Sequence, residues 1–275
     1  MAWIDSHVHV WTQDTQRYPT QPGQDLSDFE PAEFVPEHLF EHTKPSGVDR
    51  IVLVQIPTYL DNSLMIDCRT NHPGVFGIIG MVDKRRPDVG EEMARLKEQG
   101  VSGFRILGEP GHPEESLAGA AFDPMYEAAA ANDQAMCPLT HPPGAPDIVT
   151  ICRRHPKTKV VVDHLTRVGE MKPLNDEHID TLCSLAQFPR VFVKLSRFHS
   201  LGAKKPPHDD LIPMIRRVVD SFGAERLMWG SDSPFQVNTE RYEDSISLVR
   251  DKLDFLSEGQ REQVLCKTAE GLFFA

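Results

Sequence analysis

The run Ala2-Trp3-Ile4-Asp5-Ser6-His7-Val8-His9-Val10 is apolar at most positions and carries two histidines two residues apart. It predicts a strand over residues 2–10, and residues two apart on a strand face the same side. His7 and His9 therefore project together, an arrangement that suits two imidazoles binding one metal ion. The same pattern is also consistent with two solvated histidines at a strand edge. Residues elsewhere in the chain are needed to distinguish a metal site from this alternative.

Seven further apolar or β-branched runs follow this one, and several show little alternation. Continuous apolar runs of this length are typical of strands that are covered on both faces. The predicted strands cover residues 50–56, 75–82, 101–107, 135–140, 159–163, 191–195 and 226–229.

Amphipathic segments that predict helices lie between most of the strands. They cover residues 87–99, 122–133, 145–155, 176–186, 209–222 and 241–255, and residues 259–267 predict a last helix on the outside. Residues 13–45 form a long insertion after the first strand, helical only near residues 36–42. Eight strands alternating with helices in 275 residues predict a parallel sheet closed into a (β/α)8 barrel, with residues 1–275 as one domain. An open doubly wound sheet is the alternative, but no GxGxxG motif follows the first strand.

The net charge and the cysteine content limit the classes of binding partner and the cell compartment. The net charge of −12 predicts an acidic surface, which disfavours nucleic acid and anionic membranes. No apolar run reaches the roughly 20 residues of a membrane helix, and no signal peptide is visible. Five scattered cysteines without CxxC spacing are typical of a reducing compartment and predict a cytoplasmic protein. We expect a small-molecule substrate, and the composition is compatible with a homo-oligomer.

Two more strand ends carry polar residues. Asp163-His164 follows a run of three valines, and Asp232 follows Trp229-Gly230-Ser231. Gly230 is expected to free the backbone and Pro234 to stop the strand, so that Asp232 is held at the rim. Taken alone, His164 is equally consistent with a histidine bonded to backbone, and Asp232 with a helix cap.

The carboxyl ends of barrel strands converge on one face. His7, His9, His164 and Asp232 all fall at such ends, so together they predict a divalent-metal or acid–base site. His141, which follows the fifth predicted strand, belongs to the same ring.

These motifs resemble the amidohydrolase superfamily, specifically its amidohydrolase-2 branch. The resemblance runs in order from residue 3 to residue 273 and is closest to the lactonase group, which acts on sugar-acid lactones, pyrone-dicarboxylate and sulfomuconolactone. It implies a distorted (β/α)8 barrel. The matching motifs are Asp5-Ser6-His7-Val8-His9-Val10-Trp11, Gly103-Phe104-Arg105, Val161-Val162-Asp163-His164-Leu165, Val193-Lys194-Leu195-Ser196, Leu227-Met228-Trp229-Gly230-Ser231-Asp232-Ser233-Pro234 and Ala269-Glu270-Gly271-Leu272-Phe273.

The resemblance also implies one divalent metal. Superfamily members with two metals use a bridging Lys or Glu, usually on strand 4 or 5, where this chain offers Arg105, which stays protonated and cannot ligate. A single zinc is expected, with manganese as the alternative, although some lactonase members work without metal. A strand-5 histidine such as His141 resembles the metal ligand of the decarboxylases and hydratases in the same branch.

The expected activity is hydrolysis of a small lactone, a carboxylic ester. His7, His9 and Asp232, with His141, are the expected metal ligands. Asp232 and His164 are the expected catalytic residues. Arg105 is expected to bind substrate or to pair with a nearby carboxylate, and His141 is the second candidate substrate contact. The alternative activity is metal-dependent decarboxylation of an aromatic or unsaturated acid, and a non-catalytic barrel is a third hypothesis.

After the seventh predicted strand, Arg197 and His199 lie on a loop that either reaches the substrate or is solvated.

Overall fold

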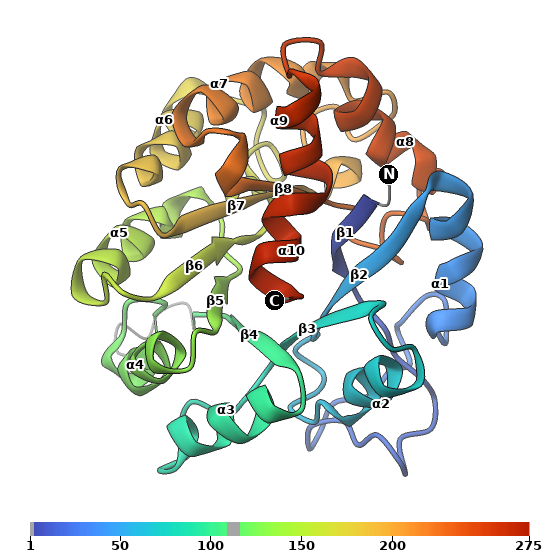
Figure 1. Cartoon of the computed structure of the whole chain (residues 1–275), viewed down its shortest axis with the longest axis vertical. Coiled ribbons are helices and arrows are strands. Elements are labelled where there is room, and N and C mark those ends of the chain that lie inside the picture. Colours follow the sequence, from blue (N-terminus) through green and yellow to red (C-terminus); the bar gives the residue numbers. More distant parts are fainter. Residues whose placement is uncertain (1–2, 109–115, 275) are drawn as a thin grey trace.

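The computed structural model describes residues 3–108 and 116–274 and contains one sheet of eight parallel strands in the order β1 to β8. Ala2, the first residue of the first predicted strand, lies outside the described residues. Figure 1 shows the strands around a central axis with helices outside them. The strands are β1 (Trp3–Val8), β2 (Val48–Val54), β3 (Phe76–Gly80), β4 (Val101–Ile106), β5 (Ala135–Pro138), β6 (Lys159–Val162), β7 (Val191–Ser196) and β8 (Leu227–Gly230).

The sheet closes through a short contact between β1 and the segment after β8. Val8 and Ser233 form a parallel bridge, and the Asp232 amide donates to the His7 carbonyl over 2.9 Å. Gly230 has ordinary backbone angles, so its expected role in freeing the backbone is wrong. A Cβ at Gly230 would lie 2.9 Å from the His7 nitrogen, so glycine is needed for the close approach of the two strands. The prediction of a distorted (β/α)8 barrel is confirmed.

Helices surround this sheet at most of the predicted places. The predicted helix over residues 209–222 begins with a 3-10 turn before α7. The main helices are α1 (Pro36–Thr43), α2 (Ser63–Asn71), α3 (Val89–Glu98), α4 (Asp123–Ala131), α5 (Ala145–Arg154), α6 (Asp176–Ser184), α7 (Ile212–Phe222), α8 (Tyr242–Ser247), α9 (Glu258–Glu262) and α10 (Thr268–Phe273). No helix in the described ranges has the length and apolar character needed to cross a membrane.

The predicted last helix, over residues 259–267, is followed by a further helix that was not predicted. The helical segment that begins at α9 continues through residues 263–267 into α10, which lies across the middle of the barrel in Figure 1. Phe273 of α10 is buried in one cluster with Ile4, Val52 and Met228. Because these strand residues come before the carboxyl ends, α10 fills the amino-terminal end of the barrel and leaves the other end for a site.

Candidate active site

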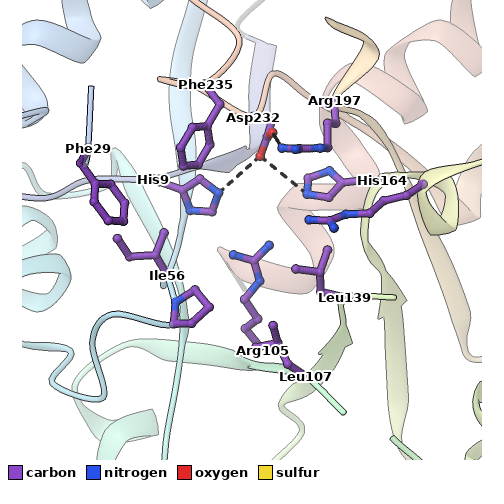
Figure 2. A pocket seen from close by; sticks show the side chains of 12 residues that line it. His9, Phe29, Ile56, Arg105, Leu107, Leu139, His164, Arg197, Asp232 and Phe235 are labelled. Atoms are coloured by element: carbon purple, nitrogen blue, oxygen red, sulfur yellow. Dashed lines mark hydrogen bonds and ion pairs between the residues drawn. The ribbon is translucent and has the colours of Figure 1, made fainter. Parts of the chain in front are cut away.

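Asp232 lies between three of the histidines that the sequence predicted for the site. Its Oδ1 is 3.3 Å from His9 Nε2, 3.6 Å from His7 Nε2 and 3.6 Å from His164 Nε2. All four side chains are buried. Figure 2 shows His9, His164 and Arg197 converging on the Asp232 carboxylate. The structure therefore brings together four of the predicted site residues, contributed by strands that are far apart in the sequence.

The hydrogen bonds behind two of the histidines orient their rings. His9 Nδ1 is 2.6 Å from the Val54 carbonyl, so this nitrogen donates and His9 Nε2 presents its lone pair to the centre. His164 Nδ1 is 2.8 Å from Ser196 Oγ, whose hydroxyl can donate to it. In that arrangement His164 Nε2 carries the proton and faces the cavity as a donor.

The protonation states follow from burial and from nearby charge. Burial lowers the pKa of His9, and lowers the pKa of His7 and His164 well below the usual value, so all three rings are neutral at neutral pH. Burial alone would raise the pKa of Asp232. The neighbouring His164 and His9 imidazoles and the guanidinium of Arg197 outweigh it and hold this pKa well below the usual value. Asp232 is therefore a carboxylate.

His7, His9 and Asp232 fit a divalent metal ion. Their ligand atoms all lie within 4.8 Å of one another, and all three residues are buried. His7 Nε2 and Asp232 Oδ1 have no hydrogen-bond partner among the described residues. With its proton on Nδ1, which lies 3.4 Å from Asp163 Oδ1, His7 turns Nε2 to the centre as an acceptor. Acceptor atoms that face one another form the kind of set that zinc takes from proteins.

His141 lies outside this group. Strand β5 ends at Pro138, two residues before the predicted strand end, and a 3-10 turn follows over Pro142–Gly144. The His141 side chain is 44% exposed; its Nδ1 lies 3.6 Å from Glu170 Oε2 and its Nε2 lies 3.2 Å from Arg167 Nη1. The structure does not place His141 with the predicted metal ligands or in the cavity beside them.

A cavity of about 390 Å³ lies over the centre. Six apolar side chains and three arginines line it besides the residues of the centre. The lining residues are His9, His164, Asp232, Arg105, Arg167, Arg197, Phe29, Ile56, Pro57, Leu107, Leu139 and Phe235. A pocket that combines apolar walls with a few convergent polar groups suits a small ring carrying charged substituents.

Contacts with protein groups hold the arginines in place but leave some of their N–H donors without a partner. Arg197 contacts Asp232 Oδ2 over 2.5 Å and Glu170 Oε1 over 3.1 Å. Arg105 donates to the Gln55 carbonyl over 3.1 Å and lies 3.6 Å from Asp163 Oδ2. The buried Nε atoms of Arg105 and Arg167 have no hydrogen-bond partner among the described residues. Guanidinium groups with unused donors around a cavity favour an anionic ligand.

Sequence reasoning missed Arg167 and Glu170. After β6, residues 164–167 all have left-handed backbone angles, with φ between 49° and 56°. This turn places His164 and Arg167 on the wall of one cavity. L-residues rarely adopt this conformation consecutively, so no sequence pattern points to it. His199, for which solvation was one expectation, is instead only 7% exposed, with its Nε2 3.8 Å from Asp232 Oδ2.

Two curated relatives are similar over most of the chain. An L-fucono-1,5-lactonase from Burkholderia ambifaria is 31% identical over 84% of this chain and 80% of its own. A 4-sulfomuconolactone hydrolase from Hydrogenophaga intermedia is 26% identical over 99% of this chain and 88% of its own.

Solved structures share the fold at lower sequence identity. An amidohydrolase from Burkholderia multivorans with bound zinc has a TM-score of 0.82 at 22% identity and covers 99% of both chains. A probable 2-pyrone-4,6-dicarboxylic acid hydrolase from Acinetobacter baumannii with citric acid bound has a TM-score of 0.82 at 21% identity and covers 100% of both. A 5-carboxyvanillate decarboxylase from Sphingomonas paucimobilis has a TM-score of 0.72 at 15% identity and covers 99% of both.

The expected resemblance is thus confirmed along the whole length. Residues 4–275 match the amidohydrolase family of the amidohydrolase-2 type, and the first relative exceeds 30% identity over more than two thirds of the chain. With its eight parallel strands and its histidines and aspartate at their carboxyl ends, this chain belongs to the amidohydrolase family.

Proposed function

We propose that this protein hydrolyses a small lactone that carries a carboxylate group. The observation that carries the proposal is the ionised Asp232 beside three neutral imidazoles, at a cavity walled by three arginines. The carboxylate supplies a proton acceptor next to the reacting carbonyl, and the arginines supply the charge that would hold an anionic ring. Both curated relatives described above are named as lactone hydrolases, which supports the reaction type.

His7, His9 and Asp232 would hold one divalent ion, which we propose to be zinc, with manganese as the alternative. The tautomer that Val54 imposes on His9 and the unpaired His7 Nε2 support this set, and a related fold carries zinc. When bound, such an ion polarises a carbonyl oxygen or lowers the pKa of water to about 7.

Asp232 is the residue we assign to proton transfer. Arg197 holds Oδ2, so Oδ1 faces the imidazoles and the cavity. As water adds to the lactone carbonyl carbon, Asp232 takes one of its protons and then delivers it to the ring oxygen as the carbon–oxygen bond breaks. A depressed pKa makes protonated Asp232 a strong acid, which favours the second transfer.

His164 and two arginines position the substrate in this proposal. With its proton on Nε2, His164 donates to the carbonyl oxygen and stabilises the negative charge that develops there. Arg105 and Arg167 bind the substrate carboxylate through their free donors. His141, at the rim beside Arg167, remains a candidate contact for a larger substrate rather than a metal ligand.

The cell compartment that we propose is the cytoplasm. All five cysteines are free thiols, and four of them are buried. Thiols that form no disulfide are typical of a reducing compartment.

Proton release distinguishes the proposed reaction from decarboxylation. Protein with zinc or manganese restored would be incubated with carboxylated lactones, sugar lactones and unsaturated acids in weak buffer with a pH indicator. Lactone opening releases a proton, whereas loss of CO2 from a carboxylate consumes one once the gas is swept out. We expect acidification with a carboxylated lactone. Alkalinisation with an unsaturated acid would overturn the proposal in favour of the decarboxylase.

Asp232→Asn is expected to lower the rate at least 10³-fold, in the range seen when a proton-transfer group is lost. Asp254→Asn is the matched control, because the Asp254 side chain is 88% exposed on the outer surface. Wild-type turnover by D232N would remove Asp232 from the reaction.

A further inference from the structure

Lys194 places a positive charge inside the barrel, directly behind the proposed metal centre. It lies on β7, its side chain is fully buried, and its Nζ is 3.1 Å from both His7 Nδ1 and Asp163 Oδ1. On the side of the barrel floor, the ring of Phe273 lies 5.9 Å from Nζ. The ammonium is therefore enclosed between the metal ligands and the apolar floor.

The neighbours of Lys194 form a second group of potential metal ligands. His7, Asp163 and His164 each offer a ligand atom, all within 4.8 Å of one another and all buried. Both carboxylate oxygens of Asp163 lack a hydrogen-bond partner among the described residues and are held by ion pairs alone. This group shares His7 with the first one, so two ions here would be neighbours.

We propose that the ammonium of Lys194 takes the place of a second metal ion and thereby limits the centre to one. This inference builds on the metal site of the proposed function. A protonated lysine has three donors and no lone pair, so it cannot ligate. It contacts two of the three residues of the second group, His7 and Asp163, and its charge repels a divalent cation at that distance.

In this proposal, the position of the Lys194 charge, and not merely the presence of a positive charge near the centre, excludes the second ion. Arg105 also pairs with Asp163, but through Oδ2 and over 3.6 Å, on the side toward the cavity. Arg105 makes no contact with His7 among the described hydrogen bonds and ion pairs. Removing Arg105 changes the local charge by the same amount as removing Lys194, yet it leaves the atoms His7 Nδ1 and Asp163 Oδ1 covered by Lys194.

Metal counting tests this proposal without any assay of activity. Wild type and K194A are stripped with a chelator, dialysed to equilibrium against the same excess of free zinc, and analysed by plasma mass spectrometry. We expect one zinc per chain in the wild type and two in K194A. A K194A protein that is folded by circular dichroism and binds no more zinc than the wild type overturns the proposal. If K194A does not fold, Lys194→Met, which is nearly as long and carries no charge, is expected to bind two zinc ions per chain as well.

Two controls separate position from overall charge. R105A is expected to stay at one zinc, and an additional ion in R105A would show that any lost cation suffices, which contradicts the proposal. Adding Asp163→Leu to K194A is expected to return the count to one, because it removes a ligand of the second group. A wild type that binds no zinc contradicts the metal centre of the proposed function, whereas the increase from wild type to K194A tests Lys194 alone.

Discussion

Asp5 is a buried carboxylate that joins the two ends of the sheet. It accepts hydrogen bonds from the His7 amide over 3.0 Å, the Ser231 amide over 2.9 Å and the Tyr242 hydroxyl over 2.7 Å. Burial raises the pKa of Asp5 to about 6 from an ordinary 3.8, although each of these bonds favours the charged form. Asp5 therefore holds His7 in place at some cost in stability at neutral pH.

The raised pKa of Asp5 makes the free energy of unfolding depend on pH, and the direction of this dependence can be predicted. Between pH 3.8 and about 6 the unfolded chain loses the Asp5 proton first, so the folded state binds more protons and stability falls as pH rises. The shift corresponds to about 3 kcal/mol. We expect the free energy of unfolding of wild type minus that of Asp5→Asn to fall by about this amount from pH 4 to pH 7. Urea titrations of chelator-treated protein measure it, and parallel pH profiles for the two proteins would contradict it.

Arg167 is the residue that the cavity assigns to the substrate carboxylate. Hydrogen bonds to charged groups contribute roughly 1.5–3 kcal/mol, so Arg167→Met should raise the KM for a carboxylated lactone by about 10- to 100-fold. The KM for an uncharged lactone should change little. Lys172→Met is the matched control, because Lys172 is an exposed cation five residues further along the chain. Equal losses with charged and uncharged lactones would contradict the assignment.

At the scale of elements, α10 shows how a short helix supports a whole barrel. Phe273 is fully buried, whereas the adjacent Phe274 is only partly buried. Phe273→Ala is expected to lower the free energy of unfolding by about 3–5 kcal/mol. Phe274→Ala should cost clearly less. Urea denaturation checks both, and equal losses in the two variants would contradict the role given to Phe273.

Which elements the sequence predicted depended on how regular their conformation is. All eight strands were predicted because buried parallel strands have continuous apolar runs, of which Val160-Val161-Val162 is an example. Helix α2 was missed, because Ser63, Asp67, Thr70 and Asn71 are weak helix formers. It forms through the tertiary packing of Leu64, Met65 and Cys68, which no local pattern reports.

The same reasoning applies to the candidate site. His7, His9, His164 and Asp232 were predicted because their place at strand ends follows from the barrel alone. The left-handed turn that brings Arg167 to the cavity, and the early end of β5 that takes His141 away, depend on loop conformations. Lys194 and Asp163 are part of the motifs quoted above, but no role was predicted for them. A charged residue within or at the end of an apolar strand could have marked both as candidate site residues.

At the scale of the molecule, metal binding and folding should be coupled. A ligand that binds only the folded state at 100 times its dissociation constant adds about 2.7 kcal/mol of stability. For a chain of this size we expect zinc to raise the melting temperature of chelator-treated protein by roughly 5 °C or more. His9→Ala should abolish this increase and His38→Ala should keep it, because His38 is exposed on α1 and belongs to neither group of potential ligands. Calorimetry measures the shift, and an increase retained by H9A would contradict the ligand set.

The molecule combines an acidic exterior with a cationic cavity. The net charge of −12 contrasts with the three arginines that line the cavity. Global charge and local recognition are therefore separate properties, and the acidic composition on its own did not indicate the charge of the expected substrate.

The floor of the barrel has a consequence for synthesis on the ribosome. The residues of α10 are translated after all eight strands, so the nascent barrel has a hollow amino-terminal end while it is being made. Ile4, Val52 and Met228 remain without their partner until Phe273 leaves the exit tunnel. Domains that fold during translation expose apolar surface until the missing segment arrives, and such surfaces are what chaperones bind. The seating of α10, at the end of the barrel opposite to the chemistry, thus has to follow the synthesis of all eight strands.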